Sequence, residues 1–225
     1  MKDKVKKVFY IDGEYTLKNN KKIICLVIIV CIVIGVIACR KIRVHIQKKQ
    51  QVQLMVEETY YLLSDIENDL GEILPEWPEW IVPNQEIPDY NICEHRLQSI
   101  SEKFVKLDNI LNYYFSSISG KPYTGILNFE FISRVLTEQE CQINDVKIPG
   151  ILADGSISEE EVQFLSTLKN DIFTIVCTME SEETHKLNHS FSMYQMESAL
   201  TNFFDKWEMK SSDSPYRLLN NSYIY

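Results

Sequence analysis

The sequence predicts an all-α protein: a single N-terminal transmembrane helix, then an antiparallel bundle of about four long helices and one short helix. Three observations predict it. An apolar run of 17 residues lies between pairs of cations, four later stretches place apolar residues three and four apart, and no comparable stretch alternates as a strand does. We therefore expect no sheet. At 225 residues, 45% of them apolar, the chain is long enough for one domain with its own core.

Residues 23–39 form the predicted transmembrane helix. Lys21 and Lys22 precede this apolar run, and Arg40 and Lys41 follow it. As an α-helix it covers about 25 Å of a hydrocarbon core roughly 30 Å thick, and the stems of the flanking cations cover the rest. The alternative is a buried core helix, but a soluble helix of this length would carry polar positions. We expect a membrane-inserted segment that acts as an uncleaved signal anchor.

Cys39 leaves a second anchoring mode open. Val36 to Cys39 resembles a bacterial lipoprotein cleavage site over these four residues only, and the resemblance implies cleavage and lipidation at Cys39. Arg40 directly after the cysteine and the distance from the N-terminus argue against it. We favour an intact helix in which Cys39 is a small, lipid-facing residue.

Charge divides the chain into two parts. Residues 1–50 carry 12 Lys and Arg against 3 Asp and Glu, whereas residues 51–225 carry 11 against 29, so the net charges are +9 and −18. Because phosphate contacts need clustered cations, we expect no nucleic-acid partner for the acidic part. Positive charge is almost balanced across the apolar run, but an outward N-terminus would require translocating a tail with seven lysines. We expect the N-terminus inside and the bundle outside the cytoplasm of a single-pass protein in the cell membrane.

The predicted domain boundaries follow these patterns. They are a basic tail over residues 1–22, the transmembrane helix over 23–39, a basic helical stalk over 40–53, an acidic bundle over 54–210 and a C-terminal tail over 211–225.

Each bundle helix is predicted from its apolar seam. The four long seams cover residues 56–73, 97–118, 165–179 and 193–207, and a shorter helix is expected over 125–138. The first helix should stop before Pro75, where a Pro-rich connector begins, and the second should end near Gly120. Residues 141–157 are expected to be a loop. Leu107 and Ile172 lie in the middle of their seams and should be buried.

Ser158 and Glu161 predict the start of the third long helix. The spacing S-x-x-E is that of a capping box, with Ile157 and Val162 as its hydrophobic staple. The preceding acid and glycine also resemble the second half of an EF-hand loop, but the first and third ligand positions would be Gly150 and Leu152, which have no side-chain oxygen. We expect a helix cap and no calcium site.

Candidates for catalysis or metal binding are few. His185 and His189 lie four residues apart and a helix would present them on one face, but the glutamate that zincins carry after the first histidine is replaced by Lys186. Of Cys93, Cys141 and Cys177, at most two can form a disulfide, and Cys177 is expected in the core because it follows Ile175 and Val176. We expect no catalytic residue, no metal site and no cofactor.

The aromatic residues Trp77 and Trp80 of the connector, with Tyr113 and Tyr114 of the second helix, are the candidate ligand lip or interaction site. The alternatives for the tryptophans are an anchor at the membrane interface and a clamp that holds the connector on the bundle, and we favour the clamp.

The sequence thus favours a membrane-anchored bundle that acts without enzymatic activity, through protein–protein contact at the membrane surface. An extracytoplasmic small-ligand binding or sensing domain is the second reading, and a metal-dependent hydrolase that uses His185 and His189 is the third. The stalk and seams also allow a homo-oligomer.

Overall fold

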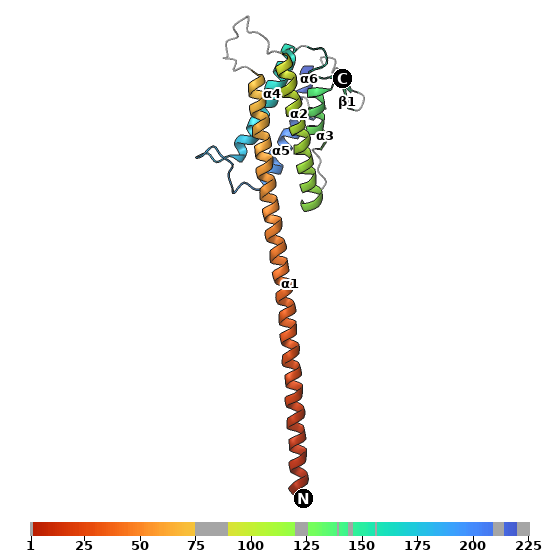
Figure 1. The fold of residues 1–225 in the computed structure, drawn as a ribbon, viewed down its shortest axis with the longest axis vertical. Coiled ribbons are helices and arrows are strands. Elements are labelled where there is room, and N and C mark those ends of the chain that lie inside the picture. The colour runs from red at the N-terminus through yellow and green to blue at the C-terminus, as the bar shows by residue number, and fades with distance from the viewer. Residues whose placement is uncertain are drawn as a thin grey trace. The chain divides into compact units, whose positions relative to one another are not determined.

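The computed structural model describes residues 2–74, 90–119, 126–138, 140–143, 146–155, 157–208 and 214–219 (Figure 1). The chain divides into two compact units, an N-terminal unit, Met1–Gln50, and a C-terminal unit, Gln51–Tyr225. Of the described residues 79% are helical, so the predicted helical class is confirmed.

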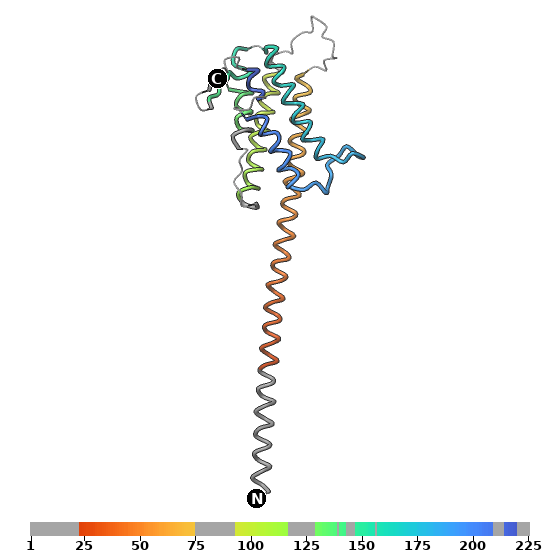
Figure 2. The backbone as a smooth tube through the Cα atoms, turned by 180° about the vertical axis from the view of Figure 1, so that it is seen from behind, coloured from red at the N-terminus to blue at the C-terminus, as the bar shows by residue number. Residues whose placement is uncertain are grey.

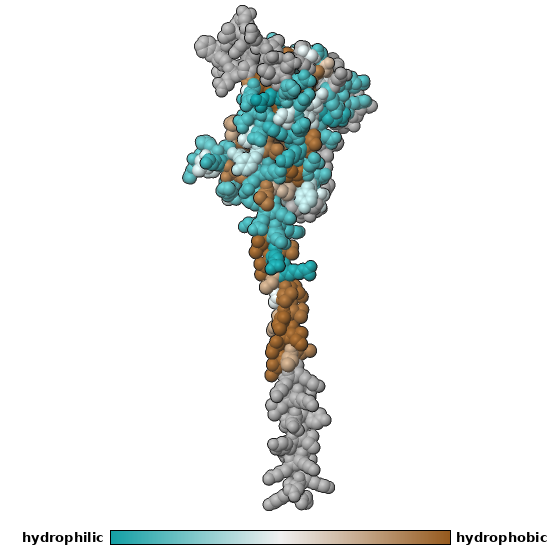
Figure 3. All heavy atoms as spheres, in the orientation of Figure 1, coloured by the Kyte–Doolittle hydropathy of each residue, from teal (hydrophilic) through white to brown (hydrophobic). Residues whose placement is uncertain are grey.

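The N-terminal unit is a single helical segment. It belongs to α1 (Lys2–Ile73), which supplies residues 51–73 to the C-terminal unit. All side chains of residues 23–39 are exposed, and Figure 3 shows them as a hydrophobic band. This part of α1 is long and apolar enough to cross a membrane, because no charged residue interrupts it.

Most helices of the C-terminal unit lie where apolar seams occur in the sequence, whereas the short last helix falls in the stretch predicted as a tail; Figure 2 shows the path of the backbone. α1 ends at Ile73, two residues before Pro75. After α1 the helices are α2 (Tyr90–Tyr113) with a π-helical turn, η1 (Tyr114–Ser119), then α3 (Ile126–Thr137), α4 (Glu159–Met179), α5 (Met193–Lys206) and the short α6 (Tyr216–Leu219).

Capping boxes fix the start of α4 and of α5. The Ser158 hydroxyl accepts from the Glu161 backbone N–H at 3.3 Å, and the Glu161 carboxylate accepts from the Ser158 backbone N–H at 2.7 Å. The predicted capping box is therefore confirmed; of the predicted staple pair, Ile157 is buried and Val162 is partly buried against the core. The same reciprocal pair forms between Ser192 and Gln195 at the start of α5.

The expectation of a fold without a sheet is wrong at one place. β1 (Glu140–Ile143) and β2 (Val146–Pro149) form a two-stranded antiparallel hairpin inside the stretch expected to be a loop. Cys141 pairs with Ile148 across the ladder, and both side chains are buried. Four-residue strands place so few side chains on one face that their alternation does not stand out in the sequence.

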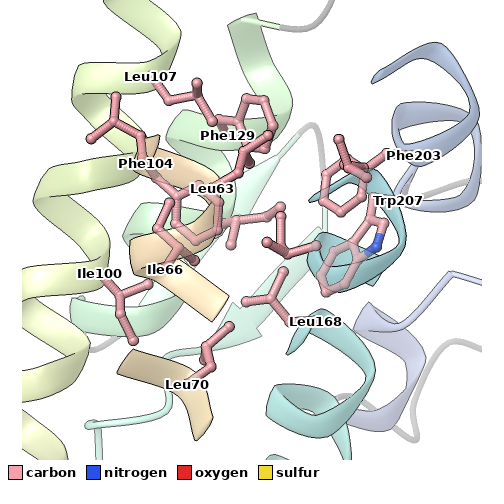
Figure 4. Packing of buried hydrophobic residues seen from close by; sticks show 14 of the residues in the cluster. Leu63, Ile66, Leu70, Ile100, Phe104, Leu107, Phe129, Leu168, Phe203 and Trp207 are labelled. Carbon is pink, nitrogen blue, oxygen red and sulfur yellow. The ribbon is translucent and has the colours of Figure 1, made fainter. Parts of the chain in front are cut away.

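One hydrophobic core joins the helices and the hairpin of the C-terminal unit. Phe129 of α3 stacks on Phe104 of α2 at a centroid distance of 5.4 Å and on Phe203 of α5 at 5.5 Å (Figure 4). Leu107 and Ile172 are fully buried, as predicted. The described part of the C-terminal tail also docks, because Tyr216 packs edge-on against Trp207.

Polar contacts tie the helices together at the edge of this core. Asp69 of α1 is buried and accepts from Lys103 Nζ at 2.6 Å, Arg96 Nη1 at 3.3 Å and Ser99 Oγ at 3.4 Å, all on α2. The Tyr60 hydroxyl of α1 donates to Oε1 of Glu180, the residue directly after α4, at 2.8 Å. Charge-assisted hydrogen bonds of this kind are stronger than neutral ones and fix which faces of the helices meet.

Candidate functional site

A groove between α4 and α5 is the candidate site. The two helices run in opposite directions, and a carboxylate of α4 binds the C-terminal end of α5. Asp171 of α4 accepts from Lys206 Nζ at 2.7 Å and from Trp207 Nε1 at 2.8 Å, one oxygen for each donor. Because Trp207 is fully buried, this contact fixes the end of α5 to the core while the rest of the groove stays open to solvent.

The floor of the groove is apolar. Ile175 of α4, Ala199 and Phe203 of α5, and Phe191 just before α5 supply it, and the groove encloses about 390 Å³. Three of the four side chains are buried, and Ala199 is half-buried. Ile175, Phe191 and Phe203 expose only 3–5% of their surface, so the floor offers a partner a shaped apolar contact and little area to bury.

The rim carries uncharged hydrogen-bonding groups. On α4, Thr174 donates to the Asn170 carbonyl at 2.8 Å and Thr178 donates to the Thr174 carbonyl at 2.6 Å. Each hydroxyl oxygen therefore still has lone pairs with which to accept a hydrogen bond. On α5, Ser198 and Asn202 line the groove, and their side chains make no hydrogen bond to the part of the chain that the structure describes.

Tyr194 forms an aromatic lip. It lies in the first turn of α5 and lines the groove, with 79% of its surface exposed. A tyrosine covers much apolar area with few rotatable bonds and keeps a polar hydroxyl at its tip. For this reason tyrosines are enriched among the residues that dominate binding energy at protein interfaces.

The groove is nearly neutral within an acidic unit. Asp171 and Lys206 are its only charged lining residues, and they neutralise each other. Residues 51–225 carry a net charge of −18, so an uncharged face of two neighbouring helices is unusual for this unit. Depletion of charge at the centre of a surface patch is typical of a protein interface.

Half of the predicted aromatic site lies outside the part of the chain that the structure describes, so the site stays a prediction. Trp77 and Trp80 lie outside the described residues. Tyr113 is exposed at the end of α2, whereas Tyr114 begins η1 and packs against the core. Burial, with a smaller effect of Glu197, raises the pKa of Tyr114. Glu197 lies on the face of α5 opposite the groove, so Tyr114 is not part of the candidate site.

The histidine pair does not have the predicted geometry. His185 and His189 lie in the connection between α4 and α5, not on a helix, and His185 has a positive φ of 49°. A one-pair bridge between Glu180 and Leu187 interrupts the helical pattern there. In the described ranges no three His, Cys, Asp or Glu side chains are placed to hold a metal ion.

The expected burial of Cys177 is wrong. Cys177 is exposed, although Ile175 and Val176 before it are buried, because each residue turns a helix by about 100°. Cys93 and Cys141 are buried, and no disulfide joins any two of these three cysteines in the described residues. Burial, followed by the charge of Glu138, raises the pKa of the Cys141 thiol to about 12, so this thiol is a poor nucleophile at neutral pH.

The sequence analysis missed the groove, although the sequence contains a signal for it. Tyr194, Ser198 and Asn202 are spaced four apart, as are Thr174 and Thr178, so each set lies on one face of its helix. The missing information is which helix faces which. The contact of Asp171 with Lys206 and Trp207, together with the shared core of α4 and α5, sets which faces line the groove.

Similarity to known proteins does not assign a function to this groove. No family model matches the chain, and no curated protein or solved structure matches it. What the site does therefore has to be argued from its own chemistry: an apolar floor, an uncharged polar rim and an aromatic lip.

Proposed function

We propose that the chain is a single-pass membrane protein whose C-terminal helical bundle binds a protein partner at the membrane surface, without enzymatic activity. The observation that carries the proposal is the neutral groove between α4 and α5 on an otherwise acidic unit. The apolar stretch of α1 supports the anchor.

The chemistry of the groove favours a peptide segment as its occupant. An apolar side chain of the partner would cover Phe191 and Phe203, while Ser198 and Asn202 would hydrogen-bond to its polar groups. Tyr194 would close over the contact from the exposed side. A strongly charged segment fits poorly, because the paired Asp171 and Lys206 leave no net charge to balance it.

The proposed orientation places the N-terminus in the cytoplasm and the bundle outside. Its support is the cost of moving seven tail lysines across the membrane, about 2.3 kcal/mol per charge per 100 mV. Protease added to intact cells or spheroplasts should digest the bundle and leave the N-terminal tail intact. Full protection of residues 51–225 would refute this orientation. Intact mass from the same membranes separates a retained helix from a chain lipidated at Cys39.

Site-specific photocrosslinking in native membranes tests the groove. A photoreactive amino acid at Ser198 should give a discrete crosslinked protein, and the same group at exposed Asn112 on α2 should not. The protein identified at Ser198 should then bind the purified full-length chain, and Asn202→Lys should weaken that binding at least about tenfold, since it places an unpaired charge against an apolar floor. Equal binding by wild type and Asn202→Lys would rule out the groove as the contact.

A small-ligand binding domain remains the second candidate, because about 390 Å³ lies within the range of small-molecule sites. The protein partner is favoured because the groove is open along its length and such ligands are usually enclosed. If a neutral small molecule raises the melting temperature of the full-length chain and Asn202→Lys abolishes this increase, the small-ligand binding domain would be favoured.

A further inference from the structure

Three cations lie directly after the apolar run of α1. Arg40, Lys41 and Arg43 are all exposed, and together they are called the cationic collar below. At 100° per residue, Arg40 and Arg43 lie about 60° apart around the helix and Lys41 lies on the other side of Arg40. The collar thus presents its charge over nearly half of the helix circumference.

The collar has no anionic partner nearby in the chain. No Asp or Glu occurs from residue 15 to residue 56, so no ion pair at a spacing of three or four can form on this part of the helix. Three cations that stay exposed without partners repel one another, and an anionic ligand would relieve that repulsion.

The position of the collar along the helix matches one layer of a bilayer. With a rise of about 1.5 Å per residue, Arg40 to Arg43 lie about 2–6 Å beyond Cys39. Because the apolar run is about 5 Å shorter than the hydrocarbon core, their backbone lies at the edge of the core and their long side chains reach the headgroups. The headgroup region on each side of the hydrocarbon core is about 5–7 Å thick. Lys48 and Lys49 lie about 14–15 Å beyond Cys39, outside this layer.

We propose that the cationic collar is a binding site for the phosphate groups of anionic lipids. The inference rests on the anchor in the proposed function and is independent of the groove. Arg40 and Arg43 are the main ligands because a guanidinium binds two phosphate oxygens at once, whereas Lys41 adds a point charge. Exposed Ile42 and Val44 lie between and after these cations, at the level of the headgroups.

Reconstitution of the full-length chain tests this site with two charge-matched variants. Wild type, Arg40→Gln/Arg43→Gln and Lys48→Gln/Lys49→Gln are placed in phosphatidylcholine vesicles. Each receives trace spin-labelled phosphatidylglycerol or phosphatidylcholine, and the motionally restricted fraction gives the preference for the anionic lipid. All three variants keep the lysines at the other end of the apolar run, so that contribution cancels in the comparison. Flotation and alkaline carbonate extraction confirm insertion.

We expect wild type to prefer phosphatidylglycerol, and Arg40→Gln/Arg43→Gln to lose about half or more of that preference, because each cation at an anionic surface is worth roughly fivefold in affinity. Lys48→Gln/Lys49→Gln should keep it. Replacing chloride by inorganic phosphate at equal ionic strength should leave the preference unchanged.

If both variants lose the preference for phosphatidylglycerol equally, or if neither loses it, the cationic collar is not the lipid site. A preference that inorganic phosphate abolishes would also overturn the proposal, because it would indicate a general anion site. These results leave the anchor standing when the chain still resists carbonate. Release of the chain by carbonate overturns the anchor itself, and the collar with it.

Discussion

Gly150 shows how closely two segments approach in the C-terminal unit. A Cβ atom at this position would overlap the carbonyl oxygen of Glu138, so no other residue fits without moving the backbone. The next residue, Ile151, is buried and donates its N–H to the Val135 carbonyl at 2.9 Å. The sequence could not indicate this requirement, because it does not show whether another segment lies close to a glycine or leaves open space beside it.

Leu107→Asp tests the core at the level of one side chain. Leu107 is fully buried in α2, so an aspartate there would be a buried, unpaired charge and should cost about 3 kcal/mol or more. Val105→Asp on the same helix is the control, because Val105 is 43% exposed and its change should stay within about 0.5 kcal/mol. Circular dichroism melting of the full-length variants measures both. Equal melting points would show that the α2 seam does not face the core.

Tyr60 should make stability depend on pH in the alkaline range. Burial, followed by the hydrogen bond to Glu180, raises its pKa from 10.0 to about 12. The folded state therefore holds the proton more tightly than the unfolded chain. The stability that this gives is complete below pH 10 and is lost as pH rises toward 12.

Urea unfolding of wild type and Tyr60→Phe at several values of pH checks this. The difference in unfolding free energy between the two should shrink from pH 9 to pH 12. At neutral pH Tyr60→Phe should cost about 1.5–3 kcal/mol, the value of a hydrogen bond to a charged group. A constant difference across this range would mean that Tyr60 titrates normally.

At the scale of elements, helix ends could be predicted and contacts between elements could not. Proline and capping residues act on their own neighbours, so Pro75 and Ser158 mark helix boundaries in the sequence itself. The hairpin of β1 and β2 was missed because its two strands depend on each other and on the core beneath Cys141 and Ile148. The groove was missed for the same reason, since it depends on how α5 packs against α4.

Ser158→Ala should destabilise the start of α4. Loss of the hydroxyl leaves the Glu161 N–H without its acceptor and should cost about 0.5–2 kcal/mol. Ser158→Thr keeps an acceptor at the same place and should recover most of the loss. Urea unfolding compares the three proteins, and a Ser158→Ala variant as stable as wild type would mean that the box contributes nothing.

The loop before α4 should not bind calcium. Gly150 and Leu152 occupy the first and third ligand positions of the EF-hand register, and neither has a side-chain oxygen. Titration of calcium into the full-length protein in a calorimeter should give no heat at millimolar concentration. A micromolar dissociation constant that Ser158→Ala weakens would contradict this expectation, because Ser158 occupies the ninth position of that register.

At the scale of the whole molecule, the division into two units follows the change in charge. The N-terminal unit ends at Gln50, close to the boundary between +9 and −18 that the sequence shows. The membrane-spanning candidate could be recognised from sequence because its signal is local and continuous. The predicted boundaries at residues 22, 39, 53 and 210 stay predictions, as does the orientation.

The C-terminal unit should fold without the N-terminal unit. Its core draws on residues from 56 to 216, and none of its core residues lies before residue 51. Residues 51–225 should therefore give a helical circular dichroism spectrum and a cooperative melt within a few degrees of the full-length protein in detergent. A fragment that is unfolded, or that melts gradually, would show that the first 50 residues are part of the same folding unit.

The contact at Asp171 divides the groove into a part that folding needs and a part that it does not. Substituting Asp171 or Lys206 disturbs the anchorage of Trp207 in the core, so these two positions are costly to vary. Tyr194, Ser198 and Asn202 lie in the groove but outside the core, and they can change at little cost to stability. Three positions on one helix face could thus be altered to change what the proposed site would recognise, with the scaffold left as it is.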